Sequence, residues 1–242
     1  MRTLKLTVEY DGTEFAGWQS QVNGRAVQDE IEKALRLILQ DEVRIVGAGR
    51  TDSGVHARGQ VASLKSSSAI DTSKLLSGLN GVLPEDICIH SVEIVPESFH
   101  ARFGATRREY SYSICLQPTA ISRRYSWHVK YPLTVDLLQS SAAEIVGRHD
   151  FTSFCKHESE VENRVCEVVR SQWEAIPNGL VYRIAADRFV HGMVRSLVGT
   201  MVDIARGYFP PDAMPGILAA LDRRKAGTAA PAKGLVLERV EY

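Results

Sequence analysis

The chain has 242 residues, with an ordinary apolar fraction of 44% and a charged fraction of 24%. These values are typical of a globular protein with one large or two modest domains, and no stretch approaches the roughly 20 apolar residues of a membrane helix. Lys and Arg number 29, as do Asp and Glu, so no overall field attracts the chain to nucleic acid. The first residues lack the apolar run of a signal peptide, so we expect a cytoplasmic protein.

The first hundred residues alternate between strand and helix patterns. Residues 4–10 have the two-residue period of a strand, and residues 27–38 have apolar residues at helical spacing. Short strands are predicted at 43–46 and 61–64, a helix at 72–81 that ends before Pro84, and a strand at 87–95. The predicted order is βαββαβ.

The second half repeats this order once an extra helix is set aside. Strands are predicted at 110–116, 165–176, 180–186 and 235–242, and Pro177-Asn178-Gly179 indicates a hairpin between the two middle ones. Helices are predicted at 134–146, 189–205 and 212–223. We therefore expect an α+β protein with two ferredoxin-like halves, residues 1–103 and 104–242. Their antiparallel sheets would pack side by side, with the active-site cleft between them.

The segment from Gly47 to Gly59 is the most unusual in the chain. It holds four glycines, two arginines, Asp52 and His56 between two predicted strands. It has neither the dinucleotide-binding fingerprint nor the Lys-Ser/Thr of a phosphate-binding loop. Thr-Asp-Ser-Gly is a good turn sequence, so Asp52 is explained by structure alone or as a carboxylate that a nearby cation keeps ionised.

Two residues of the second half are further candidates. Arg195 lies on the predicted 189–205 helix, on a face where Gly192, Ser196 and Gly199 would leave a groove. It is either an exposed arginine or one that reaches a carboxylate or phosphate across the junction of the halves. Tyr110 shares a strand face with Tyr112, so it belongs to the core or stacks on a displaced base.

Other functional classes lack support in the sequence. The four cysteines are irregularly spaced and predict free thiols, and His56, His100 and His191 lack metal-ligand spacing. No second carboxylate stands out near Asp52, which argues against a two-carboxylate glycosidase. If the chain binds RNA, three basic clusters are candidate contacts: Arg107-Arg108, Arg123-Arg124 and Arg223-Arg224-Lys225.

Six segments, in order along the chain, resemble the bacterial TruA-type tRNA pseudouridine synthases. They are YDGTEFAGWQSQ at 10–21, AGRTDSGVHARGQVA at 48–62, FHARFGATRREYSY at 99–112, HDFTSF at 149–154, FVHGMVRSLVGTM at 189–201 and APAKGLVLERVEY at 230–242. One departure is Gly192, where many relatives carry a second histidine, so His191 is given no catalytic role.

The resemblance implies a role for each matching residue. Asp52 matches the catalytic aspartate, and Arg50 an arginine that binds RNA and draws out the target nucleotide. Tyr110 matches the tyrosine that stacks on the target base, and Arg195 the arginine that pairs with the catalytic aspartate. These four residues are the candidate site.

The resemblance also implies the substrate and the assembly. The expected substrate is uridine at positions 38, 39 and/or 40 of the tRNA anticodon stem-loop, bound across a homodimer, with no metal or organic cofactor. Two alternatives stay open: an RNA-binding protein without activity, and a nucleoside glycosidase that would release free uracil.

Overall fold

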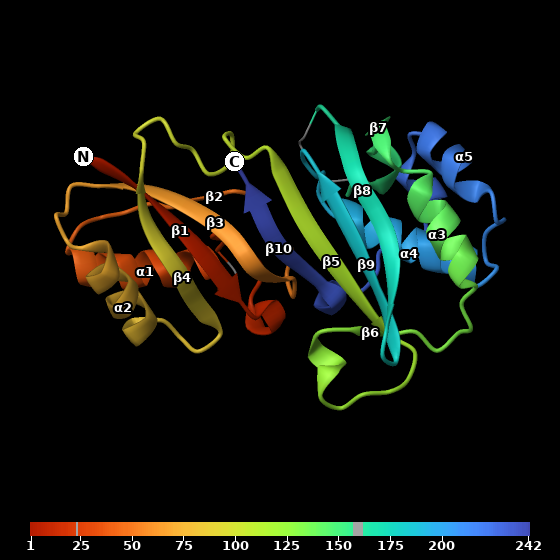
Figure 1. Cartoon of the computed structure of the whole chain (residues 1–242), viewed down its shortest axis with the longest axis horizontal. Coiled ribbons are helices and arrows are strands. Elements are labelled where there is room, and N and C mark those ends of the chain that lie inside the picture. Colours follow the sequence, from red (N-terminus) through yellow and green to blue (C-terminus); the bar gives the residue numbers. More distant parts are fainter. Residues whose placement is uncertain (23, 157–161) are drawn as a thin grey trace. The chain divides into compact units, whose positions relative to one another are not determined.

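A computed structural model describes residues 1–22, 24–156 and 162–242. It divides into two compact units (Figure 1). The N-terminal unit comprises Met1–Thr106 and Val236–Tyr242, and the C-terminal unit comprises Arg107–Leu235. Both contain helices and mixed β-sheet, so the chain has an α+β fold. Within the described ranges, no helix is both long and apolar enough to span a membrane.

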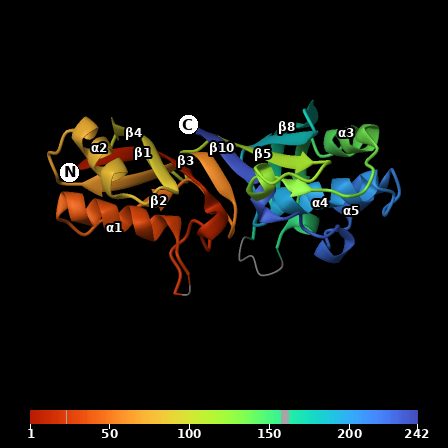
Figure 2. The same ribbon diagram turned by 90° about the horizontal axis from the view of Figure 1, so that it is seen from below.

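The N-terminal unit has the predicted βαββαβ order. Its elements are β1 (Arg2–Tyr10), the 3-10 turn η1 (Gly12–Glu14), α1 (Val27–Leu39), β2 (Val46–Gly47), β3 (His56–Ser66), α2 (Thr72–Val82) and β4 (Ile87–Val95). The strand order is β4-β1-β3, with antiparallel pairing throughout, and β2 is antiparallel to β3. Figure 2 shows α1 lying along one face of this sheet.

Local sequence explains where these helices begin and end. The Asp71 side chain accepts hydrogen bonds from the backbone N–H groups of Ser73 and Lys74, which caps the first turn of α2. This helix ends at Val82, before Pro84, as predicted. Helix α1 carries acidic residues in its first turn, where they complement the helix dipole, and it buries Ile31 and Leu35.

The last strand of the chain departs from the expectation. β10 (Leu235–Glu241) was predicted to close the second half, but it pairs in parallel with β3, with Val236 opposite His56 and Leu237 opposite Ala57. A parallel pair needs a long connection, and the chain between Ser66 and Leu235 supplies one. The sheet is therefore mixed and not antiparallel as predicted. The pairing also places β10 beside the first residues of β3, which follow the Asp52 loop.

The C-terminal unit is built around β5 (Arg107–Cys115), β9 (Gly179–Ala186), β8 (Val165–Ile176) and β7 (Gly147–Asp150), antiparallel and in that order. A short strand, β6 (Trp127–His128), is parallel to β5. The helices are α3 (Val135–Ala143), α4 (Met193–Ala205) and α5 (Ala213–Ala219), and the 3-10 turns are η2 (Ser122–Arg124), η3 (Thr152–Phe154), η4 (Arg223–Lys225) and η5 (Ala232–Gly234).

Helix α4 is the buried centre of this unit. It contacts α3 and α5, and nearly all of its residues are inaccessible to solvent. It begins at Met193, four residues later than predicted, because Gly192 has a φ of 74° and lies in the left-handed region. The β8–β9 hairpin turns where predicted, with Asn178 at a φ of 62°.

Candidate functional site

Asp52 lies in a tight turn between β2 and β3. The N–H of Val55 donates to the carbonyl oxygen of Asp52 at 3.1 Å, which closes the turn Asp52–Val55. Gly54 has a φ of 75°, a conformation that favours glycine. Asp52 itself is half-buried. The turn therefore presents one carboxylate at the end of a well-packed strand.

The residues on both sides of Asp52 are hydrogen-bonded to the segment 10–18. The Tyr10 hydroxyl and Thr51 Oγ1 are 2.7 Å apart, and the Trp18 N–H donates to the Thr51 carbonyl at 3.2 Å. The Phe15 carbonyl accepts from the Gly54 N–H at 3.3 Å and from Ser53 Oγ at 3.1 Å. The backbone is thus held immediately before and immediately after the carboxylate.

Two glycines make this close approach possible. A Cβ atom on Gly12 would lie 2.0 Å from the Val55 carbonyl oxygen, and one on Gly17 would lie 2.6 Å from that of Thr51. Gly17 also has a φ of 117°. Reasoning from residue patterns missed this segment as the support of the loop, although YDGTEFAGW was among the motifs of the resemblance. Its signal in the sequence is a pair of glycines between aromatic residues.

The two arginines of the loop have different partners. Arg50 is exposed, and its Nε donates to Gln19 Oε1 at 3.2 Å. Arg58 lies on β3, and its Nη1 is 3.0 Å from Glu238 Oε1 on β10. Arg50 therefore lies at the surface beside the Asp52 turn, a position suited to RNA. Arg58 joins two neighbouring strands.

Tyr110 lies on β5 in the C-terminal unit. Its ring packs edge-to-face against Phe189, with the centroids 5.0 Å apart, and it is 9% exposed. Tyr112 is on the same face, fully buried, and its hydroxyl donates to the Pro231 carbonyl at 2.8 Å. The predicted shared face is confirmed, and the small exposed area of Tyr110 distinguishes it from Tyr112.

Arg195 lies in the first turns of α4 and is half-buried. Its Nε donates to the Ala230 carbonyl at 2.8 Å, and the Ala230 N–H donates to the Arg195 carbonyl at 2.9 Å. Arg195 also lies close enough to Tyr112 for its positive charge to oppose the effect of burial, which raises the pKa of the Tyr112 hydroxyl. Arg195 is therefore linked to the backbone of Ala230 through both its side chain and its own backbone.

The groove predicted on α4 is filled. A Cβ on Gly199 would lie 1.8 Å from the Thr228 carbonyl oxygen, and the Gly227 N–H donates to Thr200 Oγ1 at 2.9 Å. Residues 227–230 therefore run along the helix at Ser196 and Gly199, where the side chain is small or absent. The small residues make room for the protein's own backbone, and this same backbone orients Arg195.

The four candidate residues thus fall into two pairs. Asp52 and Arg50 lie in the N-terminal unit, and Tyr110 and Arg195 lie in the C-terminal unit. Each has a defined local setting, and their joint action stays a prediction.

Arginines of all three basic clusters make contacts within the protein. Arg223 Nη1 donates to the Gly227 carbonyl at 3.0 Å, and burial lowers the pKa of its guanidinium. Arg224 Nη2 is 2.8 Å from Asp222 Oδ2, and this pairing raises the pKa of the Arg224 guanidinium. Arg123 and Arg124 are exposed on η2. Arg123 Nη1 donates to the Ala120 carbonyl at 2.6 Å, and Arg108 Nη1 donates to the Asp187 carbonyl at 2.8 Å. Members of all three clusters therefore have local structural roles, and contact with RNA stays a prediction.

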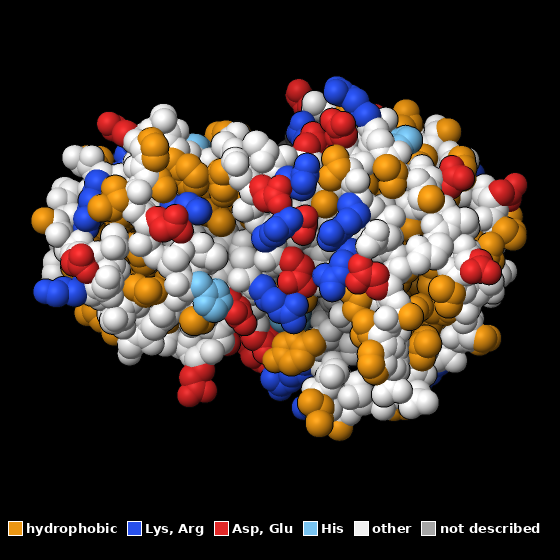
Figure 3. All heavy atoms as spheres, viewed as in Figure 1, with side chains coloured by type: hydrophobic (Ala, Val, Ile, Leu, Met, Phe, Trp, Pro, Cys, Tyr) orange, Lys and Arg blue, Asp and Glu red, His pale blue; other side chains and the backbone are white. Residues whose placement is uncertain are grey.

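Charges alternate on the face shown in Figure 3, where Lys and Arg side chains are interspersed with Asp and Glu. Over the C-terminal sheet, Arg170 pairs with Glu109 at 3.6 Å and Arg183 with Glu174 at 2.8 Å. This mixing reflects the balanced composition of the chain. Among the described residues, no group of three or more His, Cys, Asp or Glu side chains is arranged to hold a metal ion.

Comparison with known proteins identifies the family. A family described as tRNA pseudouridine synthase matches residues 6–104 and 141–242. The tRNA pseudouridine synthase A of Moorella thermoacetica is 44% identical over 247 residues, covering 100% of both chains. That of Bacillus subtilis is 40% identical over 243 residues, covering 99% of this chain and 98% of that protein.

Among solved structures, a chain of an archaeal box H/ACA sRNP Nop10–Cbf5 complex aligns with 97% of this chain and 48% of its own length. Its identity is 12% and its TM-score 0.41, a likeness too low to bear on function. The sequence relatives match this chain from end to end, at identities well above those that establish common descent. The chain belongs to the tRNA pseudouridine synthase family of isomerases.

Proposed function

We propose that the protein converts uridine to pseudouridine at positions 38, 39 and/or 40 in the anticodon stem-loop of tRNAs, with Asp52 as the catalytic carboxylate. Asp52 is the residue that matches the family's catalytic aspartate, in the motif GRTDSGVHA. One observation supports this assignment above all. Residues 51, 53 and 54 are hydrogen-bonded to segment 10–18, and these bonds give the Asp52 carboxylate a defined position.

The reaction breaks the bond between ribose C1′ and N1 of uracil, turns the freed base, and joins C1′ to C5. N1 gains a proton and C5 loses one, so no redox partner or activated donor is consumed. In these reaction steps, a positioned carboxylate acts as a nucleophile or as a base toward the sugar or the ring. Asp52 takes this role in the proposal.

Arg50 and Tyr110 are proposed to bring the base to the carboxylate and hold it there. The target base must leave its stack, at a cost of a few kcal/mol. Arg50, exposed beside the Asp52 turn, is proposed to bind the RNA and draw the nucleotide out. The Tyr110 ring is proposed to stack on the displaced base, which offsets about 1–3 kcal/mol of that cost.

Arg195 is proposed to pair with the Asp52 carboxylate through its guanidinium. Such a pair keeps the carboxylate ionised and orients it through two parallel hydrogen bonds. The bond from Arg195 Nε to the Ala230 carbonyl supports this role, because it fixes the plane of the fork. The proposal includes a homodimer in the cytoplasm, with one tRNA bound across both subunits.

Release of tritium from tRNA carrying 5-tritiated uridine tests the reaction, since joining C1′ to C5 expels the C5 hydrogen. We expect release with the unaltered protein and none with Asp52→Asn, while tRNA affinity is largely kept. Asp41→Asn is the matched control, because Asp41 is an exposed carboxylate of the same unit. Substrates with a single uridine at position 38, 39 or 40 identify the sites modified.

Two results would overturn the proposed activity, and a third would overturn the role of Asp52. If the unaltered protein binds tRNA without releasing tritium, it is an RNA-binding protein without this activity. If free uracil accumulates in solution, the protein is a glycosidase. If Asp52→Asn releases tritium at the rate of the Asp41→Asn control, the activity stands and Asp52 is a structural turn residue.

A further inference from the structure

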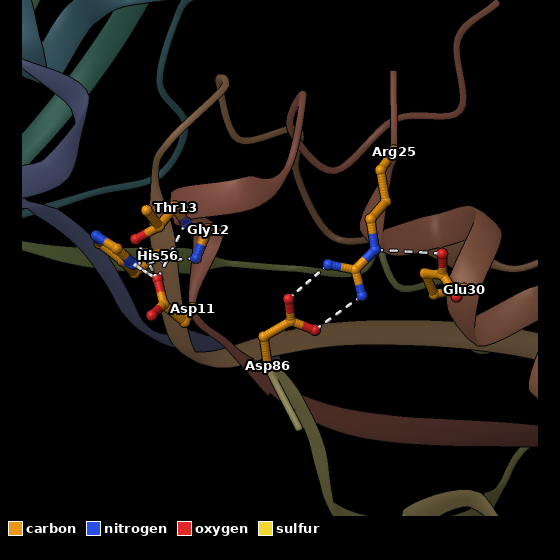
Figure 4. A network of polar contacts seen from close by, with 7 residues as sticks. All are labelled: Asp11, Gly12, Thr13, Arg25, Glu30, His56 and Asp86. Atoms are coloured by element: carbon orange, nitrogen blue, oxygen red, sulfur yellow. Dashed lines mark hydrogen bonds and ion pairs between the residues drawn. The ribbon is translucent and has the colours of Figure 1, made fainter. Parts of the chain in front are cut away.

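His56 is a buried histidine four residues after Asp52, at the first position of β3. It is 4% exposed, and its Nδ1 accepts a hydrogen bond of 3.0 Å from the backbone N–H of Gly12 (Figure 4). Gly12 begins the η1 turn, which follows β1. The side chain therefore joins the strand after the Asp52 loop to the turn that supports this loop.

Two groups lie within hydrogen-bond distance of His56 Nδ1, the Gly12 N–H and a carboxylate oxygen of Asp11. A ring nitrogen that accepts a hydrogen bond carries no proton, so acceptance from Gly12 requires the tautomer with its proton on Nε2. Asp11 Oδ1 lies 3.1 Å from the same Nδ1, and it already accepts from the N–H of Thr13 at 3.0 Å and from Thr13 Oγ1 at 2.6 Å. Asp11 thus caps the η1 turn, and His56 satisfies the buried Gly12 N–H.

The η1 turn reaches the Asp52 loop at both of its ends. At its start, Gly12 is in backbone contact with Val55, where even a methyl group would collide. At its end, the Phe15 carbonyl accepts from Ser53 and Gly54. Movement of this turn therefore moves the backbone that carries Asp52.

A second set of contacts holds the outer side of the turn. The Asp11 N–H donates to the backbone carbonyl of Asp86 at 3.0 Å, and the Asp86 carboxylate accepts from Arg25 Nη1 at 2.5 Å and Nη2 at 2.9 Å (Figure 4). The Arg25 guanidinium also lies 4.2 Å from the centroid of the Phe15 ring. The bond from Gly12 to His56 is a direct link between the start of the turn and β3.

We propose that His56 is a positioning residue for the catalytic loop: its Nδ1 accepts the Gly12 N–H and so holds the η1 turn, and through it Asp52, in place for reaction. This inference rests on the proposed role of Asp52. His56 acts through Gly12 and does not touch the substrate. Misplacing a reacting group by about 1 Å costs on the order of 100-fold in rate, so the chemical step is the sensitive readout.

Two amide variants separate the position of the hydrogen-bond acceptor at residue 56 from the size of its side chain. In His56→Asn the amide oxygen is as many bonds from Cβ as Nδ1 is, so it can accept the Gly12 N–H. In His56→Gln the oxygen lies one bond further out, where Nε2 was. We expect the single-turnover rate of tritium release to stay within about tenfold of the unaltered protein for His56→Asn, and to fall roughly 100-fold for His56→Gln.

Both variants should bind tRNA within about threefold of the unaltered protein, because the His56 side chain is buried. His90→Gln is the matched control, since His90 is exposed on β4 of the same unit, and its rate should be unchanged. Equal rates for His56→Asn and His56→Gln would overturn the proposal. So would a loss confined to tRNA affinity, with the chemical step intact.

The tautomer of His56 can be measured without any variant. Two-bond ¹⁵N–¹H correlation spectra of the unaltered protein at neutral pH should show His56 with its proton on Nε2. A proton on Nδ1, or an imidazolium, would overturn the inference, because neither can accept the Gly12 N–H. If the unaltered protein released no tritium, the proposed function would fail while this spectrum still reported on the His56–Gly12 bond.

Discussion

Gly199 of α4 lies directly against the backbone of Thr228, so that a Cβ atom on the glycine would stand 1.8 Å from the Thr228 carbonyl oxygen. Ala230, two residues further on, exchanges backbone and side-chain hydrogen bonds with Arg195. The absence of a side chain at position 199 therefore lets this segment lie against α4, and the segment in turn orients Arg195.

Gly199→Ala should destabilise the protein strongly. The methyl group has no room, and backbone must move to accept it, so we expect a loss of about 3 kcal/mol in the free energy of unfolding, measured by urea denaturation. Gly216→Ala on α5 is the matched control, because nothing lies within 4 Å of that position. It should be neutral or stabilising by about 0.5–1 kcal/mol, since alanine is the better helix former. Equal effects at the two positions would contradict the close contact.

Arg195→Lys should abolish most activity even though it conserves charge. Lysine has no Nε–H to donate to the Ala230 carbonyl, and its ammonium cannot present two parallel donors to a carboxylate. We expect the single-turnover rate to fall at least about 100-fold, with a smaller change in tRNA affinity. Arg206→Lys is the control. Arg206 is the residue after α4, and this variant also replaces an arginine that pairs with a carboxylate, that of Asp203. A rate near that of the control would exclude a forked contact as essential.

The elements with a strong local pattern were predicted closely. β4 and β8 have the bounds expected, Ile87–Val95 and Val165–Ile176, because period-two alternation and flanking turn residues define both ends. The start of α4 was placed four residues too early, since the apolar spacing continues through Phe189 and only the φ of Gly192 interrupts the helix. Local patterns thus locate elements better than their ends.

These local patterns do not predict contacts between residues that are far apart in the sequence. The small residues of α4 were recognised as a groove, but nothing near them in the sequence indicates that residues 227–230 fill it. The same holds for β10, whose alternation predicts a strand and says nothing of its parallel partner β3. For the site, the motif around Asp52 indicated the loop, whereas its support by Gly12 and His56 depends on packing between chain segments.

Tyr110→Leu should slow the chemical step more than it weakens binding. Leucine keeps apolar contact with Phe189 but offers no flat ring on which the displaced base can stack. Loss of about 1–3 kcal/mol of stacking corresponds to roughly a 5- to 150-fold fall in the single-turnover rate. Tyr110→Phe keeps the ring and should stay close to the unaltered protein. If Tyr110→Leu reacted as fast as Tyr110→Phe, the residue would belong to the core alone.

Cys166 should resist alkylation in the folded protein. Burial, and to a lesser degree the charge of Asp187, raises the pKa of its thiol to about 12, so at pH 8 only about one molecule in 10⁴ carries the reactive thiolate. Cys88 is exposed on β4 and serves as the internal reference. Peptide mass spectrometry after a brief iodoacetamide treatment at pH 8 should find Cys88 modified and Cys166 modified only in urea. Equal labelling in the folded state would contradict this burial.

Alanine at Gly47 and alanine at Gly49 should have different effects. The comparison distinguishes a glycine that the fold needs from one that the substrate needs. At Gly47 a Cβ atom would lie 2.5 Å from Trp18 Nε1, so Gly47→Ala should lower the free energy of unfolding by about 1–3 kcal/mol. At Gly49 nothing lies within 4 Å and φ is not positive, so alanine should leave stability unchanged or raise it by up to about 1 kcal/mol.

The carbonyl of Gly49 is fixed by the Gln60 side chain at 2.9 Å, and its Cα lies beside Arg50 in the Asp52 loop. If this glycine serves the substrate, RNA approaches its Cα closely, and Gly49→Ala lowers kcat/KM for tRNA at least tenfold. Tritium release measured beside urea unfolding separates the two effects. A stable Gly49→Ala protein with unchanged kcat/KM would show that the target nucleotide passes elsewhere over the loop.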